Sequence, residues 1–129
     1  MVAYLLDYLA ETTRFQGIRE VLRKPASPEL AADQVGEQEL MPFPILDACF
    51  YLFAGEKLVP DEVLAAVKEM FPEVPEAALK EHVQKFVKLF VRSIYKWVQS
   101  PLSLHIGNLD LERERALQLP VVTKSDWWE

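Results

Sequence analysis

The sequence predicts a mostly α-helical fold, and three observations predict it. Apolar residues recur every three or four positions over several long stretches. Prolines stand at or near the ends of those stretches, where helices start and stop. No stretch sustains the alternation of apolar and polar residues that marks a half-buried strand. Half of the 129 residues are apolar, so the chain can bury a core.

The first predicted helix begins at once with VAYLLDYLAETT. A second, short helix is predicted from Gly17 to Leu22 and ends at the Lys24–Pro25 pair, because a residue before proline disfavours helical backbone. No capping loop precedes the first helix. We therefore expect the chain to be a fragment of a longer protein. Apolar residues of the first helix with helical spacing are Val2, Leu5, Leu6 and Leu9.

The middle of the chain predicts two further helices. Pro42 and Pro44 open the stretch PFPILDACFYLFA, which is apolar on nearly every side and is therefore expected to be buried. Gly55 ends it. Pro60 begins the next helix, which has two acidic residues in its first turn, where they favour the helix dipole. Pro72 ends that helix.

The longest periodic stretch predicts an amphipathic helix over residues 75–99, ended by Pro101. Residues 100–129 form a tail with little regular pattern. The apolar side of the helix contains Val83, Phe86, Val87, Phe90, Ile94, Trp97 and Val98. A basic stripe occupies the opposite side: Lys85, Lys88, Arg92 and Lys96. The stripe is typical of a solvated helix face, although it is also suited to binding a phosphate.

Composition excludes several classes of function. A formal net charge of −6 argues against a nucleic-acid-binding protein. No apolar run has the length of a membrane span, and no signal-peptide pattern opens the chain, so we expect a cytoplasmic location and no membrane partner. The single cysteine, Cys49, excludes an internal disulfide and is predicted to be a buried, inert thiol. The two histidines have no metal-ligand spacing and receive no role.

Residues 24–41 form a polar, acidic loop that is predicted to act as a lid. Carboxylates and a hydroxyl on such a loop suit the Mg²⁺ of a nucleotide site, and an ordinary surface loop is the alternative interpretation. The residues concerned are Ser27, Glu29, Asp33, Glu37 and Glu39.

Three spaced motifs together resemble the NAD synthetase family. They are RKPASPELAADQVGEQEL followed by FPILD, then RSIYKWVQSP, and finally LQLPVVTKSDWWE. The resemblance covers about residues 20–129, with a weakly matched insert around residues 100–117. That insert looks more like the longer, glutamine-dependent enzymes.

The resemblance implies a fold and an activity. It implies that the chain is the helical C-terminal fragment of a doubly wound α/β synthetase domain of the adenine-nucleotide-hydrolase type, which is usually a homo-oligomer. Such enzymes activate the carboxylate of deamido-NAD with ATP and Mg²⁺, and ammonia derived from glutamine then displaces AMP to give NAD. The family's Ser-Gly-Gly pyrophosphate loop and its amidase nucleophile do not occur in this sequence. The fragment alone is therefore expected to be inactive.

The family's roles carry over only to matching residues. Ser27, Glu29 and Glu37 correspond to the ATP and metal side of the lid, with Glu37 assisting the metal. Lys96 corresponds to the lysine on the deamido-NAD side, and Tyr95 stands where the short enzymes have a histidine. The resemblance places no catalytic residue within the fragment.

A second hypothesis is a free-standing helical protein-interaction module. It would use Trp127 and Trp128 or the apolar face of helix 75–99. A Ser-Gly-Gly-x-x-Ser loop encoded upstream of Met1 would favour the enzyme over this alternative.

Overall fold

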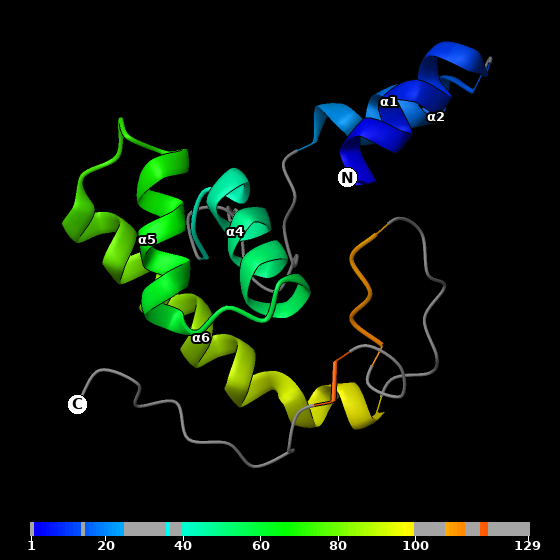
Figure 1. Cartoon of the computed structure of the whole chain (residues 1–129). Helices are drawn as coiled ribbons and strands as arrows, with labels where there is room; N and C mark the ends of the chain where they lie inside the picture. Colours follow the sequence, from blue (N-terminus) through cyan, green and yellow to red (C-terminus); the bar gives the residue numbers. More distant parts are fainter. Residues whose placement is uncertain are drawn as a thin grey trace. The chain divides into compact units, whose positions relative to one another are not determined.

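The computed structural model describes residues 2–13, 15–24, 36, 40–99, 108–112 and 117–118. Within these ranges every regular element is helical, and the prediction of a mostly α-helical chain is confirmed. The chain divides into two compact units, Met1–Leu40 and Met41–Glu129, and each is described by itself. The elements, labelled in Figure 1, are α1 (Val2–Thr12), α2 (Gln16–Arg23), α4 (Phe43–Cys49), the π-helix η1 (Phe50–Gly55), α5 (Pro60–Met70) and α6 (Glu76–Gln99).

The first unit contains a hairpin of α1 and α2, which pack against each other (Figure 1). The guanidinium of Arg19 in α2 donates to the carbonyl of Ala10 in α1, with 3.4 Å between Nη2 and O. Ala10 is buried, whereas Leu5, predicted to belong to the apolar side, is 45% exposed. The hairpin therefore covers only one side of α1.

The second unit begins with α4 and η1, which follow each other without a break. Pro42 is the residue before α4 and Pro44 lies in its first turn, as predicted from the missing proline N–H. After Cys49 the hydrogen bonding widens, and the N–H of Glu56 donates to the carbonyl of Tyr51 at 2.9 Å. Gly55 is the last residue of η1. The sequence predicted one continuous buried helix here and did not predict the π-helical part.

The start of α5 follows the sequence signals closely. The Glu62 carboxylate accepts a hydrogen bond from the N–H of Val59 at 3.0 Å, which satisfies one of the donors that a helix start leaves unpaired. Helix α6 begins directly after Pro75, whose carbonyl accepts from the N–H of Leu79 at 3.1 Å. The predicted helix over residues 75–99 is thus confirmed as Glu76–Gln99.

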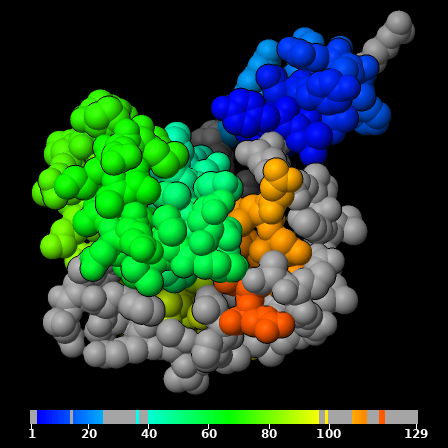
Figure 2. Space-filling model, in the orientation of Figure 1, coloured from blue at the N-terminus to red at the C-terminus, as the bar shows by residue number. Residues whose placement is uncertain are grey.

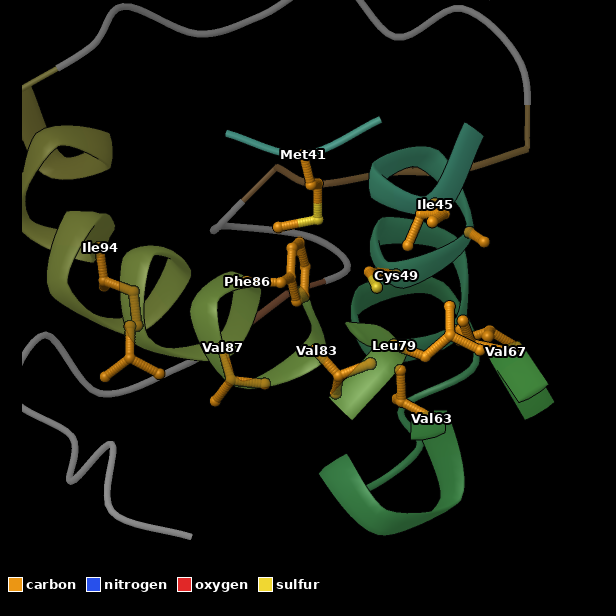
Figure 3. Close-up of a cluster of buried hydrophobic side chains, with 13 residues drawn as sticks. Met41, Ile45, Cys49, Val63, Val67, Leu79, Val83, Phe86, Val87 and Ile94 are labelled. Carbon is orange, nitrogen blue, oxygen red and sulfur yellow. The ribbon is translucent and has the colours of Figure 1, made fainter. Parts of the chain in front are cut away.

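The core of the second unit lies between α4, α5 and α6, which pack against one another. In Figure 3, Leu79 and Val83 of α6 lie beside Val63 and Val67 of α5, and Phe86 faces Met41. Full burial of one such apolar side chain contributes about 1.5–3 kcal/mol. The buried cluster contains Met41, Ile45, Ala48, Cys49, Leu52, Val63, Val67, Leu79, Val83, Phe86, Val87, Val91 and Ile94.

Part of the predicted C-terminal tail packs against the core helices. Residues 108–112 lie beside η1 (Figure 2), and Leu117 is buried. A Cβ added to Gly55 would lie 3.1 Å from the Cδ1 of Leu109. The described tail residues, 108–112 and 117–118, include no helix or strand. No helix in the described part of the chain is long and apolar enough to cross a membrane.

Candidate functional site

The two residues predicted for the deamido-NAD side lie together near the C-terminal end of α6. Tyr95 is 50% exposed and Lys96 is also exposed. Ile94, the residue before them, is 3% exposed and belongs to the buried cluster. The packing of Ile94 therefore fixes the direction in which this turn of the helix presents its polar side chains. An ammonium group at such a position can donate to a carboxylate or a phosphate.

The basic stripe is less uniform than the sequence predicted. Lys88, Arg92 and Lys96 are exposed, as expected for the side opposite the core. Lys85, predicted to be part of the solvated surface, is only partly exposed. Helical periodicity assigns a residue to a side of the helix, but it does not report what else in the chain covers that side. Lys96 also lies in the last turn, where a cation is favoured by the helix dipole.

The predicted lid falls mostly outside the described residues. Ser27, Glu29 and Glu37, assigned to the ATP and metal side, are among those outside, as are Asp33 and Glu39. One finding bears on the loop: the N–H of Leu40 donates to the carbonyl of Gly36 at 2.9 Å, and Gly36 is helical. This i to i+4 bond is helical geometry that the sequence interpretation of an irregular loop did not include.

The thiol of Cys49 is buried among the core side chains, as predicted (Figure 3). Burial raises the pKa of Cys49 from its usual value of 9.0 to about 12, because desolvation disfavours the thiolate. A nucleophilic cysteine needs a lowered pKa and access to solvent, and Cys49 has neither.

The end of η1 is a feature that the sequence interpretation missed. A hydrogen bond between Tyr51 and Glu56, together with the charge of Glu56, raises the pKa of Tyr51. Lys57 follows in the left-handed conformation, with φ of 63°, and its ammonium donates to the carbonyl of Ala54. Leu109 lies against Gly55 at the same place. The sequence signal was a glycine followed by two charged residues, which predicts only a helix end.

The described residues contain no group of three or more His, Cys, Asp or Glu side chains that could hold a metal ion. Trp127, Trp128 and His105, considered in the sequence, lie outside the described residues. Of the predicted site residues, the structure therefore brings together Tyr95 and Lys96 alone among those it describes.

No family model, no curated protein and no solved structure matches this chain.

Proposed function

We propose that the chain is the C-terminal helical portion of the synthetase domain of a glutamine-dependent NAD⁺ synthase. The whole enzyme would be a ligase of the doubly wound α/β type and would act as a homo-oligomer in the cytoplasm. The observation that carries the proposal is the order and spacing of the three motifs within residues 20–129. The pair formed by Tyr95 and Lys96 supports it, because both side chains are exposed at one end of a helix anchored in the core.

The proposed reaction converts the nicotinate carboxylate of deamido-NAD into an amide. ATP adenylates the carboxylate and releases pyrophosphate, and ammonia derived from glutamine then displaces AMP. Lys96 is the residue of this chain that would contact the deamido-NAD side, as a compact positive charge facing a carboxylate or phosphate. Tyr95 would lie beside the same ligand as a hydrogen-bonding group.

The lid residues would act on the ATP side of the site. Ser27 would donate its hydroxyl to a phosphate, and the carboxylates of Glu29 and Glu37 would lie near the bound metal. Mg²⁺, when bound with ATP, would offset the negative charge of the phosphates. Closure of a polar loop over the site would exclude water from the reactive adenylate.

The cheapest test is the reading frame upstream of Met1 in the source gene. We expect it to encode a Ser-Gly-Gly-x-x-Ser loop. An in-frame stop codon directly upstream, with no such loop, would rule the proposal out. We also expect the chain alone to form no NAD from deamido-NAD, ammonium and Mg-ATP, because this sequence lacks the pyrophosphate loop. Turnover above a no-protein control would contradict the assignment.

The residue-level test uses Lys96→Ala in the full-length enzyme. A charge-assisted hydrogen bond contributes about 1.5–3 kcal/mol, so kcat/KM for deamido-NAD should fall roughly tenfold to a hundredfold. Lys88→Ala is the matched control, since Lys88 is an exposed lysine two turns earlier on the same stripe. Lys85 is a poorer control because it is partly covered. Equal losses in the Lys96 and Lys88 variants would show that the stripe is only the solvated side of α6.

A protein-interaction module is a second candidate function, and one observation favours it. The first helix exposes large apolar side chains that its partner α2 does not cover: Tyr4 is 82% exposed and Tyr8 is 62% exposed. The sequence interpretation placed the interaction surface elsewhere, on Trp127 and Trp128 or on the apolar face of α6. That face of α6 belongs to the buried core in the described residues, so it is not free to bind a partner.

A further inference from the structure

The carbonyl of Leu52 shows how η1 differs from an α-helix. In the structure it accepts a hydrogen bond from the N–H of Leu58 at 3.1 Å. The N–H of Glu56 donates instead to the carbonyl of Tyr51, five residues earlier, at 2.9 Å. In an α-helix the N–H of Glu56 would donate to Leu52, four residues earlier. The two kinds of helix therefore assign the Leu52 carbonyl to different donors, and an experiment can tell them apart.

The side chains at the end of η1 fit the wider π-helical turn. Tyr51 and Glu56 are joined by a hydrogen bond between their side chains as well as by the one between their main chains. Residues five positions apart lie about 140° apart around an α-helix, so this side-chain bond belongs to the wider turn. Lys57 follows with a φ of 63°, a left-handed backbone that residues other than glycine adopt only where their surroundings hold it. This end of the helix therefore needs support from other parts of the chain.

Residues 108–112, which we name the strap, lie beside η1 (Figure 2). A Cβ added to Gly55 would lie 3.1 Å from the Cδ1 of Leu109 and 3.7 Å from the Cδ2 of Tyr51. The Leu109 side chain thus packs where Gly55 has no side chain, next to the Tyr51 ring. Conversion of η1 to α-helical bonding removes one residue from the turn and would rotate Gly55 away from Leu109 by about 100°. The contact between Leu109 and Gly55 is therefore specific to the π-helical form.

The strap is itself held in place on the second unit. The carboxylate of Asp110 accepts a hydrogen bond from the N–H of Glu112 at 2.8 Å, which closes a turn directly after Leu109. The carbonyl of Glu112 accepts from the N–H of Leu117 at 3.3 Å, and Leu117 is 3% exposed. The burial of Leu117 therefore helps to fix the position of Leu109.

The form of η1 also affects the packing of α6. The Phe53 ring of η1 contacts two rings of α6, with its centroid 5.8 Å from that of Phe86 and 5.4 Å from that of Phe90. Because conversion to α-helical bonding rotates the later residues of η1 relative to the earlier ones, it would turn Phe53 out of these contacts. A change of form at η1 would therefore change how α6 packs.

We propose that η1 is a conformational switch between π-helical and α-helical hydrogen bonding, and that the strap selects the π-helical form through the contact of Leu109 with Gly55. When the strap is displaced, the N–H of Glu56 donates to the carbonyl of Leu52, and the packing of Phe53 on α6 changes. The proposal concerns the second unit alone and does not depend on the function proposed above.

The test is nuclear magnetic resonance of the full chain, in which the scalar coupling across a hydrogen bond identifies the acceptor carbonyl. In the unaltered chain we expect a coupling from the nitrogen of Glu56 to the carbonyl carbon of Tyr51. Leu109→Ala removes the contact with Gly55 and should transfer that coupling to the carbonyl carbon of Leu52. The matched control is Leu111→Ala, since Leu111 is a second partly buried leucine of the strap, and it should leave the coupling on Tyr51.

Hydrogen exchange is the second measurement. The amide of Leu58 loses its acceptor in the α-helical form, so Leu109→Ala should raise its exchange rate at least about tenfold. The amide of Val63 in α5, which donates to Val59 at 2.9 Å, should keep its rate and so show that the unit stays folded. An unchanged rate at Leu58 in Leu109→Ala would overturn the proposal.

Gly55→Ala tests the same contact from the other side and decides the matter should Leu109→Ala not fold. The added Cβ would press on Leu109, and alanine favours α-helix over glycine, so the coupling should again transfer to Leu52. Three results overturn the proposal: a coupling to Leu52 in the unaltered chain, a coupling that stays on Tyr51 in both variants, or an equal transfer in Leu111→Ala.

Discussion

Replacement of Phe86 by alanine should remove a large part of the stability of the second unit. Phe86 is 3% exposed and lies in a cluster of four phenylalanine rings. Its ring centroid is 5.0 Å from that of Phe50, 5.8 Å from that of Phe53 and 5.5 Å from that of Phe90. Two of these rings belong to η1 and two to α6, so the cluster joins the two elements.

The size of the effect follows from burial and cavity formation. Truncation of a buried phenylalanine to alanine costs about 3–5 kcal/mol, because the transfer free energy of the ring is lost and the cavity collapses only in part. Phe90 provides a matched comparison. Its centroid lies 5.9 Å from that of Phe50 and 5.4 Å from that of Phe53, so it shares these two ring partners with Phe86, yet it is only half-buried. Phe90→Ala should cost about half as much, roughly 1.5–2.5 kcal/mol.

The assay is urea unfolding followed by far-ultraviolet circular dichroism, which reports mainly on the helices of the second unit. With a slope of about 1–1.5 kcal/mol per molar urea, Phe86→Ala should lower the midpoint by about 2–5 M. Should that variant not fold, Phe86→Leu keeps an apolar side chain and should cost about 1–1.5 kcal/mol. Equal losses for the two alanine variants would show that ring pairing, worth about 0.5–1.5 kcal/mol per pair, outweighs burial and would refute the reasoning.

Two other predictions test single features of the same unit. The buried Cys49 thiol should resist a maleimide reagent in the native chain and react on unfolding, and rapid labelling of the native chain at pH 8 would contradict its burial. Folding raises the pKa of Cys49 from 9.0 to about 12. Its contribution to the free energy of unfolding is therefore present below about pH 9 and is lost as the pH rises toward 12. A double-mutant cycle on the free energy of unfolding tests the contact between Gly55 and Leu109. Gly55→Ala should be more favourable by about 0.5–1 kcal/mol in the Leu109→Ala background than with Leu109 present, because the added Cβ would lie 3.1 Å from the Leu109 Cδ1. Zero coupling would show that Leu109 moves aside freely.

The sequence predicted the long helix and its inner side well, because both follow from local periodicity. Val83, Phe86, Val87 and Ile94 were assigned to the core and are buried. The same reasoning placed the starts of α4 and α5 at their prolines, where the structure has them. Such signals act over a few residues, so one sequence is enough to read them.

Contacts between distant parts of the chain could not be predicted in this way. Leu109 approaches Gly55 although the two positions are more than fifty residues apart in the sequence. No local pattern around either residue predicts this contact. The sequence also did not predict the change from α-helical to π-helical hydrogen bonding after Cys49. The stretch FYLFA is apolar on every side, so its pattern is compatible with both types of helix. Helical spacing likewise did not predict that Lys85 is only partly exposed.

The candidate site depends on both kinds of information. Tyr95 and Lys96 were identified from a local motif, but whether they can contact a ligand depends on the direction of the C-terminal end of α6. That direction is set by the core, since Val87, Val91 and Ile94 pack on one side of the helix and leave the polar pair on another. These apolar residues belong to the same buried cluster as Phe86. Because all of them lie on α6, a change in how the core packs should shift the whole helix and with it Tyr95 and Lys96. A loss of activity in a core variant would therefore report displacement of α6, whereas a loss in Lys96→Ala, with stability unchanged, would report a contact with the ligand.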